Sequence, residues 1–391
     1  MSKKIIVSEF VSSGHPDKIA DVISDKLLDA YLLVDEDTRA GIEVMVKDNI
    51  VVLGGEVTSS ATIDYDTIIR RIYNKYDFPS SHHLSGKDIK IINLIGKQSD
   101  EIHSGVDKSA TEIGAGDQGF VVGFASNDTE VYMPLGHYLA KKICQYITSQ
   151  REYELGPDTK TQVIIERDTV TNKNKVVSIL VSTMHQCDLE NCRDFVKKSI
   201  LFNNVGIDND LFVKYIADNK IQIDVNPCGS WQMGGPVSDC GVTGRKLVVD
   251  QYGGYCNIGG GNLSGKDYSK VDRSAAYMAR YLAKNIVAAK ISNTAKVEIS
   301  YMIGVCEPCS INIELDTNND KVGGIKEWIK KNVDLTPYGI MKRFSYWYPR
   351  NARVQSMGYY GYNVDNDEHK SILFPWEKLD LVKDLYETFN N

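Results

Sequence analysis

The chain is predicted to have an α+β fold of three similar α+β units related by pseudo-threefold repetition, each a mixed sheet with helices on one face. The first observation behind this prediction is a recurring order of strand, helix, strand, strand, helix and strand. The second is the length of 391 residues, which suits two or three domains. We expect the units at residues 1–101, 114–232 and 234–376.

The first unit shows the pattern most clearly. Pro16 suits the first turn of a helix that runs to about residue 33, and Ile19, Ile23 and Leu27 recur within that helix at helical spacing. The other elements expected in this unit are a strand over 5–7, a hairpin of strands over 42–46 and 50–57, a helix over 65–76 and a strand over 89–95.

The same order recurs in the second unit and, less regularly, in the third. In the second we expect strands over 119–125 and 129–133, a helix over 135–150, strands over 161–167 and 176–185, a helix over 189–201 and a strand over 221–226. In the third we expect a strand over 246–250, a helix over 271–291, strands over 297–305 and 309–314 and a helix over 323–332.

Composition excludes several classes of protein. Apolar residues make up 42% of the chain and charged residues 25%, as in an ordinary globular protein. A net charge of −7 argues against a general nucleic-acid binder, and no apolar run is long enough to cross a membrane. The first residues become polar at Ser8, too soon for a signal peptide, so we expect a cytoplasmic protein.

A glycine-rich stretch over residues 259–273 predicts a nucleotide triphosphate site. Glycines let backbone N–H groups crowd around an anion, and Lys266 and Lys270 can neutralise phosphate charge. Asp272 can hold a divalent ion that phosphates share. The stretch differs from a P-loop, because Asp267 stands where a Ser or Thr would hold magnesium.

A second cluster lies at the start of the first helix. Helix N-termini attract anions, so His15 could act as an acid toward a phosphate-ester oxygen and Asp17 could bind magnesium. A capped helix start with a surface histidine explains the same residues equally well.

Two further clusters of residues each give weaker evidence for a ligand-binding site. Asp117 sits among three glycines at 114–119, which is typical of ligand approach but also of a tight turn. Asp239 precedes Arg245 and Lys246, a pattern that suits a zwitterionic or phosphate ligand but also a charged surface. Together the four clusters hold more cations, carboxylates and glycine turns than a purely structural explanation accommodates.

Long segments of the chain resemble the signature motifs of the methionine adenosyltransferase (S-adenosylmethionine synthetase) family. The main matches are residues 9–18, 114–119 and 259–267, and further matches are residues 54–56, 95–99, 271–277 and 374–378. The resemblance runs from end to end of the chain. It implies three similar α+β domains and an enzyme of one-carbon metabolism.

The resemblance also implies a reaction. ATP and L-methionine would form S-adenosylmethionine when the thioether sulfur attacks C5′ of the ribose and displaces tripolyphosphate. The enzyme would then hydrolyse tripolyphosphate to pyrophosphate and phosphate. Two Mg²⁺ ions per site and K⁺ would assist, and a homodimer or homotetramer would place each active site at a subunit interface.

Residue roles follow by position from the same resemblance. The residues implied to be catalytic are His15, Lys160, Arg245 and Lys266. Those implied to contact ATP are His15, Asp117, Asp158, Lys160, Ser230, Trp231, Asp239, Arg245, Lys246, Asn262 and Lys266. Those implied to bind methionine are Glu56, Gln98, Asp239 and Lys270, and those implied to bind metal are Asp17 and Asp272 for Mg²⁺ and Glu43 for K⁺. Residues 98–108 match a loop that covers the site.

The chain departs from the family pattern beside the expected substrate pockets. Trp231 stands where Phe is usual, Ser230 where Arg is frequent, and Asn262 and Leu263 where Ala and Phe are usual. None of these changes removes a charged catalytic group. We therefore expect an altered tolerance for methionine analogues.

Two other functions fit some of the same residues. An ATP-dependent phosphotransferase could use the triphosphate site, although no kinase-type catalytic loop is present. A non-catalytic regulatory subunit could keep the fold, but it should have lost catalytic charges that this chain retains at His15, Lys160 and Lys266.

Overall fold

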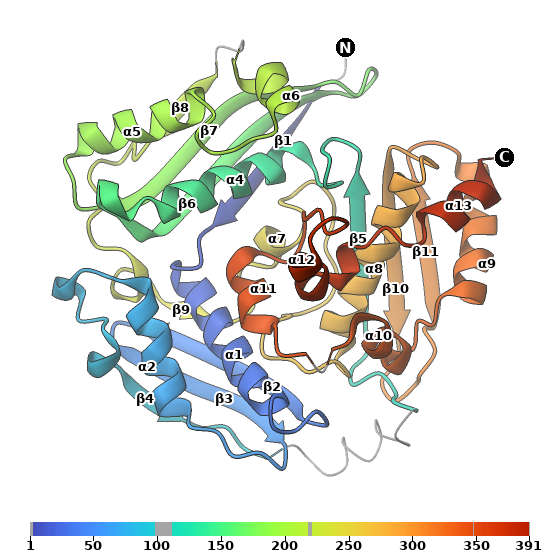
Figure 1. The fold of residues 1–391 in the computed structure, drawn as a ribbon, viewed down its shortest axis with the longest axis horizontal. Helices are drawn as coiled ribbons and strands as arrows, with labels where there is room; N and C mark the ends of the chain where they lie inside the picture. The colour runs from blue at the N-terminus through green and yellow to red at the C-terminus, as the bar shows by residue number, and fades with distance from the viewer. Residues whose placement is uncertain (1–2, 98–111, 218–220, 347, 391) are drawn as a thin grey trace.

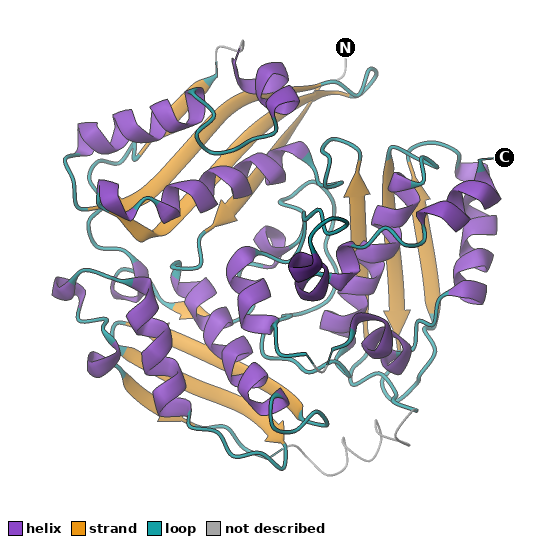
Figure 2. Cartoon of the chain, in the orientation of Figure 1, coloured by secondary structure: helices purple, strands orange, loops and turns teal. Residues whose placement is uncertain are grey.

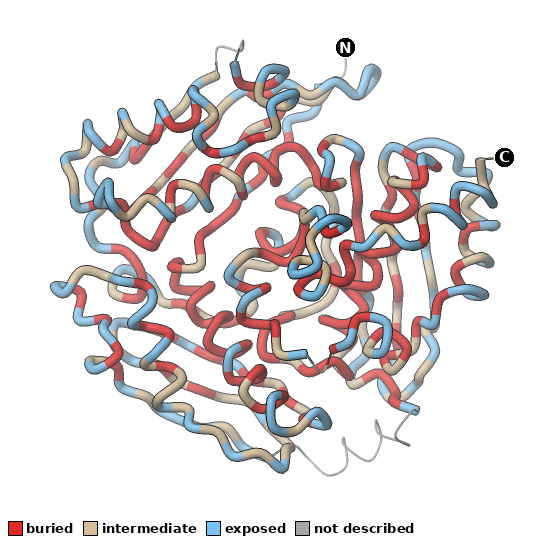
Figure 3. Tube along the Cα trace, in the orientation of Figure 1, coloured by how far each residue is buried: buried red, intermediate tan, exposed pale blue. Residues whose placement is uncertain are grey.

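A computed structural model describes residues 3–97, 112–217, 221–346 and 348–390. Three separate sheets, each covered by helices, surround a middle region (Figures 1 and 2). In that region lie the short helices α11 (Asn351–Met357) and α12 (Glu368–Leu373). Much of the chain around the centre is buried (Figure 3).

The first sheet has the strand order β4-β3-β2-β9. Its strands are β2 (Arg39–Lys47), β3 (Ile50–Thr58), β4 (Lys90–Asn93) and β9 (Gly241–Val242). Helices α1 (Pro16–Leu32) and α2 (Tyr65–Tyr76) lie over it. β4 runs parallel to β3 and the other pairings are antiparallel, so this sheet is mixed.

The second sheet repeats this design with the order β1-β6-β7-β8. Its strands are β1 (Lys3–Val11), β6 (Leu155–Asp168), β7 (Asn174–His185) and β8 (Gln222–Val225). Helices α4 (Leu135–Ser149) and α5 (Leu189–Leu201) cover it, and the short α6 (Asn209–Phe212) follows them. The pairing of β8 with β7 is again parallel.

The third sheet has the order β11-β10-β5. Its strands are β5 (Gly119–Ser126), β10 (Thr294–Tyr301) and β11 (Ser310–Leu315). Helices α8 (Val271–Ala288) and α9 (Val322–Asn332) pack on it. Among the described residues every pairing in this sheet is antiparallel, so it differs from the mixed sheet that was expected. The α+β class itself is confirmed.

Each sheet takes an edge strand from another segment of the chain. β1 from the first segment pairs with β6 of the second, and β5 from the second pairs with β10 of the third. β9 from the third segment pairs with β2 of the first, which closes the ring. The three units are therefore interlocked, because each contributes a strand to the sheet of another. The predicted domain boundaries, at residues 1–101, 114–232 and 234–376, remain predictions.

Two expected strands are wrong. Residues 129–133 form a tight turn, in which Tyr132 has a φ of 59° and the Thr129 hydroxyl accepts a hydrogen bond of 3.0 Å from Met133 N–H. Residues 246–250 contain the short helix α7 (Leu247–Asp250), because buried Lys18 forms an ion pair with Asp250 that holds a helical turn in place. A short apolar run is compatible with both a strand and a helical turn, so a contact with a distant residue determines which of the two forms.

Four helices near the end of the chain were not predicted from the sequence. These are α10 (Pro337–Phe344), α11, α12 and α13 (Val382–Phe389). Each is short, between 6 and 8 residues, so each spans too few turns to show a clear helical period.

Among the described residues, the helices that pack on the three sheets leave one face of these sheets open, and side chains on that face are partly apolar. Along β1, exposed Ile5 and Val7 alternate with buried neighbours. Met45 on β2 alternates with buried neighbours in the same way, and Phe120 near the start of β5 is also exposed. This alternation separates a helix-covered side from an open side.

Candidate active site

His15 is the residue that caps the first turn of α1. The backbone N–H of Asp17 donates a hydrogen bond of 3.1 Å to its Nδ1. Because Nδ1 is the acceptor, a neutral ring carries its proton on Nε2. Burial and then the charge of Lys246 lower the pKa of His15 to about 3, so the ring is neutral at pH 7.

Asp17 joins α1 to the segment that follows β9. Its Oδ1 accepts a hydrogen bond of 2.9 Å from Val242 N–H, and its Oδ2 accepts one from Lys246 Nζ. Arg245 lies 3.8 Å from Oδ1. Burial opposes the charged form, but the bonds from Lys246 and Val242 outweigh it and hold the pKa of Asp17 below its usual range.

Asp158 and Lys160 come from β6 and differ in their surroundings. Asp158 is buried, accepts a hydrogen bond of 2.8 Å from Gly235 N–H, and has its pKa raised to about 7 by burial. Lys160 is exposed on the open side, beside a cavity of about 180 Å³. Its charge also lowers the pKa of His15, so it belongs to the same electrostatic site.

The glycine-rich stretch forms a loop before α8, as the sequence indicates. Lys266 Nζ lies 2.7 Å from Oδ2 of Asp272, in the first turn of that helix. A Cβ at Gly261 would lie 2.9 Å from the same oxygen, and Gly265 has a φ of +73°. Glycine is therefore required for the close approach of this loop to the carboxylate and for its turn.

Glu43 projects from β2 toward two residues of the site. The Thr243 hydroxyl donates to its Oε2, and Asn262 Nδ2 lies 3.4 Å from its Oε1. Asn262 also accepts a hydrogen bond of 2.9 Å from Ser264 N–H, so its side chain links Glu43 to the glycine-rich loop.

Ser230 and Trp231 lie beside His185, a buried residue at the end of β7. Trp231 N–H donates a hydrogen bond of 3.2 Å to His185 Nε2, and the Ser230 hydroxyl lies 3.3 Å from the same nitrogen. The Trp231 indole N–H donates to Met233 O at 2.8 Å. The segment predicted to contact ATP is thus held in place through its backbone.

The remaining residues predicted to bind ATP or methionine make fewer contacts with the rest of the site. Asp117 and Asp239 are exposed, and each carboxylate accepts a hydrogen bond from the backbone N–H of the residue that follows it. Within the described parts of the chain, Glu56, Asp239 and Lys270 make no hydrogen bond or ion pair with one another; Lys270 instead forms an ion pair of 2.7 Å with Asp267. Gln98 and the predicted covering loop over 98–108 lie outside the described residues.

Three buried carboxylates of α1 were not predicted from the sequence. Asp21, Asp25 and Asp29 continue from Asp17 at every fourth position of α1. An acidic stripe of this spacing on a helix with an otherwise apolar sequence is the signal that could have revealed them, because buried carboxylates require partners.

The open side of the sheets carries several of the predicted residues. Glu43 on β2, Glu56 on β3 and Lys160 on β6 are all exposed there, next to the buried start of α1. The arrangement brings cations and carboxylates to the first turns of two helices, α1 and α8. Such a site suits a polyphosphate together with the cations that accompany it.

Comparison with known proteins identifies the family. Models of the three domains of S-adenosylmethionine synthetase match the chain, the N-terminal domain over residues 3–100, the central domain over 112–231 and the C-terminal domain over 233–378. The chain belongs to the S-adenosylmethionine synthetase family. The sequence-based assignment to this family is therefore confirmed.

Relatives extend the match over the whole chain. The S-adenosylmethionine synthase of Mycoplasmopsis pulmonis (strain UAB CTIP) is 39% identical over 396 residues, with 100% of both chains covered. An unusual S-adenosylmethionine synthetase from Campylobacter jejuni has a similar structure, with a TM-score of 0.86, 34% identity and coverage of 98% of this chain and 99% of that one.

Family membership confirms that the chain is an enzyme, a methionine adenosyltransferase, with a three-domain α+β fold. Such transferases form S-adenosylmethionine. No helix in the described parts of the chain is long and apolar enough to span a membrane.

Proposed function

We propose that the chain forms S-adenosylmethionine from ATP and L-methionine in two steps. The thioether sulfur attacks C5′ of the ribose and the C5′–O bond breaks, so tripolyphosphate leaves with the electron pair. Water then cleaves the bound tripolyphosphate to pyrophosphate and phosphate. A neutral sulfur is a weak nucleophile, so alignment and stabilisation of the leaving group must supply most of the catalysis.

The observation that carries this proposal is a pair of matching contacts at two helix starts. Lys246 meets Asp17 in the first turn of α1, and Lys266 meets Asp272 in the first turn of α8. Both lysines can turn from these carboxylates to phosphate oxygens, and both helix N-termini favour anions. Arg245 and Lys160 add two further charges to the same site.

His15 acts as a hydrogen-bond donor to the departing 5′ oxygen. Its ring is neutral at pH 7, and its Nδ1 is engaged by Asp17 N–H, so Nε2–H is the free donor. A neutral donor stabilises the developing charge without first taking up a proton from solution. The contact predicted for His15 on the ATP 5′ oxygen is consistent with this tautomer.

Asp17 and Asp272 would hold the two Mg²⁺ ions. Their carboxylate oxygens are the hard ligands that Mg²⁺ prefers, and each already has a lysine partner that a cation would release toward the phosphates. Mg²⁺ would supply charge neutralisation on the phosphate chain. Glu43, with the Thr243 hydroxyl beside it, offers oxygen ligands that fit K⁺.

The substrate contacts follow the predicted residues. Asp117, Asp158, Ser230, Trp231, Asp239 and Asn262 are the remaining residues proposed to contact ATP. Glu56, Gln98, Asp239 and Lys270 are proposed to bind methionine, whose ammonium and carboxylate groups need partners of opposite charge. Lys270 would have to leave Asp267 to do so.

We also propose that a second copy of the chain covers the open side of the sheets, as a homodimer or a homotetramer. Exposed Ile5, Val7, Met45 and Phe120 on that side favour burial. Lys160 and Glu56 project from the same side, so a second copy would complete the active site at the interface. We propose a cytoplasmic enzyme that needs no nucleic acid or membrane.

One assay tests the proposed reaction against both alternatives. The pure protein is incubated with ATP, L-methionine, Mg²⁺ and K⁺, and products are identified by mass spectrometry. The proposal predicts a sulfonium product together with pyrophosphate and phosphate. ADP formed without methionine would instead favour a phosphotransferase, and no product at all would favour a regulatory subunit.

A further inference from the structure

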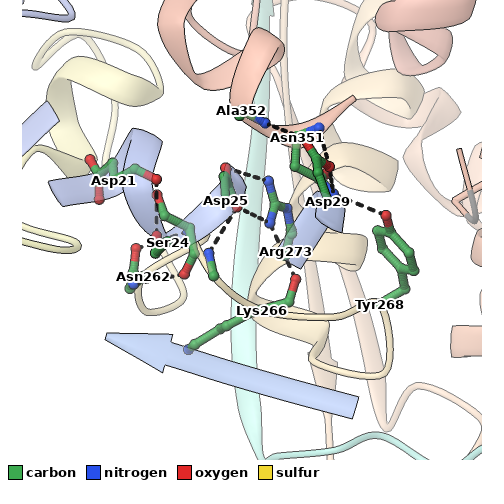
Figure 4. A network of polar contacts seen from close by, with 12 residues as sticks. Asp21, Ser24, Asp25, Asp29, Asn262, Lys266, Tyr268, Arg273, Asn351 and Ala352 are labelled. Carbon is green, nitrogen blue, oxygen red and sulfur yellow. Dashed lines mark hydrogen bonds and ion pairs between the residues drawn. The ribbon is translucent and has the colours of Figure 1, made fainter. Parts of the chain in front are cut away.

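Four aspartates follow one another at every fourth position of α1: Asp17, Asp21, Asp25 and Asp29. Residues four apart lie on one face of a helix, so the four side chains form a stripe. All four are buried, although carboxylates seldom are unless they are paired. Figure 4 shows the last three members of this aspartate stripe, Asp21, Asp25 and Asp29, with the contacts of Asp25 to Arg273 and of Asp29 to Asn351 and Ala352.

Each member of the aspartate stripe contacts the third segment of the chain. Asp25 accepts a hydrogen bond of 2.8 Å from Gly265 N–H and forms a two-bond ion pair with Arg273, at 2.6 and 2.9 Å. Asp29 accepts bonds of 2.9 and 3.0 Å from the backbone N–H groups of Asn351 and Ala352. The stripe therefore fastens loops from the third segment to a helix of the first.

Asp21 occupies the point where the two cation-bearing segments meet. Its Oδ1 accepts a hydrogen bond of 3.0 Å from Gly244 N–H, one residue before Arg245. Burial raises the pKa of Asp21 to about 7, while hydrogen bonds from Gly244 N–H and from the Ser264 hydroxyl, two residues before Lys266, favour its charged form. Lys18 Nζ lies 3.4 Å from its other oxygen and balances its charge.

The segment before Arg245 and the glycine-rich loop also pack closely against each other beside Asp21. A Cβ at Gly244, which has a φ of +71°, would lie 2.6 Å from the Cβ of Asn262. The two segments are therefore in close contact beside Asp21. A displacement of one segment would be transmitted to the other.

We propose that Asp21 is a positioning residue of the active site, whose carboxylate aligns the backbone before Arg245 and Lys246 with the glycine-rich loop that carries Lys266. This inference rests on the proposed function, because the aligned cations are those assigned to the phosphate chain. Asp21 itself does not touch substrate. Its effect comes through Gly244 and Ser264.

Asp29 provides a matched control. It lies on the same face of the same helix, is equally buried, and also accepts backbone N–H bonds. The residues it holds, Asn351 and Ala352, carry no predicted contact with substrate. Substitutions at Asp29 therefore reproduce the loss of a buried carboxylate without disturbing the cation-bearing segments.

The test compares Asp21→Ala and Asp21→Asn with Asp29→Ala and Asp29→Asn. The kcat and the KM for methionine are measured below the unfolding temperature of every variant. We expect Asp21→Ala to lower kcat by about 100-fold with little change in that KM, because a shift of about 1 Å in catalytic groups costs on this order. Asp21→Asn should recover most of the loss, since its amide oxygen still accepts from Gly244 N–H. Both Asp29 variants should keep kcat within about threefold of the parent.

An unchanged kcat in Asp21→Ala, or an equal loss in Asp29→Ala, would overturn the positioning role. A second measurement needs neither turnover nor the alanine variants. Binding of inorganic tripolyphosphate, measured by calorimetry, should weaken about threefold in Asp21→Asn and stay unchanged in Asp29→Asn, because mispositioned charges lose part of a charge-assisted contact. Equal affinities would overturn the inference, whereas a parent protein that forms no S-adenosylmethionine would overturn only the proposed function.

Discussion

Asp17 and Asp272 occupy the same position in two helices, since each is the second residue of its helix, α1 or α8, and each accepts a hydrogen bond from a lysine outside that helix. The contacts with Lys246 and Lys266 therefore repeat one design in the first and third units. Such a repeat places two positive groups and two carboxylates at helix starts that favour anions. The following predictions depend on this pairing.

Replacing Lys266 by methionine should nearly abolish formation of S-adenosylmethionine. The variant keeps most of the length of the side chain but removes one positive charge that faces the leaving group, and loss of one such donor lowers kcat by about 100- to 1,000-fold. Product formation is measured by mass spectrometry. Lys331→Met changes an exposed lysine in the same way and should leave the rate unchanged. Turnover of Lys266→Met at the parent rate would remove this residue from the mechanism.

Replacing Asp272 by asparagine should raise the Mg²⁺ concentration needed for half-maximal activity. The variant keeps the shape of the side chain but removes a charge that suits a hard cation. We expect an increase of about tenfold or more, which corresponds to roughly 1.4 kcal/mol. Chelation of Mg²⁺ should stop the parent enzyme, and added Mg²⁺ should restore it. The same Mg²⁺ dependence in parent and variant would show that Asp272 holds no metal.

His137 should make the stability of the protein depend on pH. Burial, followed by the charges of Lys141 and Arg280, lowers the pKa of His137 to about 3. Below about pH 6.5 the imidazole of His137 binds a proton in the unfolded chain but stays neutral in the folded chain. The free energy of unfolding therefore decreases as the pH drops from 6.5 toward 3.

The measurement for His137 is the difference in unfolding free energy between the parent and His137→Gln across this range. The difference should change by up to about 1.4 kcal/mol per pH unit below pH 6.5 and remain constant above it. His83→Gln, at an exposed histidine, serves as the control. A difference that does not vary between pH 4 and pH 6, both roughly inside this window, would contradict the expected loss of stability in acid.

Substrate selectivity should depend on Trp231. Its indole N–H donates to Met233 O, a contact that phenylalanine cannot make, and its backbone is held by His185. We expect the parent enzyme to accept S-ethyl and S-allyl analogues of methionine in a different order from ordinary family members. Trp231→Phe should move this order toward theirs. The measurement is the relative kcat/KM for methionine and the two analogues. A parent enzyme with the same order of preference as ordinary family members would contradict the prediction.

Local patterns in the sequence were sufficient for most helices and strands. The helices over 65–76 and 189–201 begin and end where expected, because each has an apolar face at helical spacing and an aspartate cap, Asp64 or Asp188. The hairpin of β2 and β3 also appears as predicted. These signals lie within a few residues of one another, so the sequence alone reveals them.

Features that depend on distant contacts could not be predicted. The turn of α7 depends on the ion pair between Asp250 and Lys18, which are separated by 232 residues. The exchange of β1, β5 and β9 among the three sheets depends on pairings between segments. No local period records which sheet an edge strand joins.

The residues of the active site also fall into those that the sequence predicts and those that it does not. The motifs around His15, Lys246 and Lys266 were recognisable because their residue types and spacing point to phosphate chemistry. Asp21 and Asp25 were missed because their partners, Gly244 and Arg273, lie far away along the chain, at separations of 223 and 248 residues.

A crystal structure of the enzyme with the β,γ-imido analogue of ATP, L-methionine and Mg²⁺ tests the central claim most directly. That claim is that one phosphate chain lies between the starts of α1 and α8. The account predicts phosphate oxygens within about 3 Å of the Lys246 and Lys266 amines, with the 5′ oxygen at hydrogen-bond distance from His15 Nε2. A phosphate chain bound away from both lysines would contradict it.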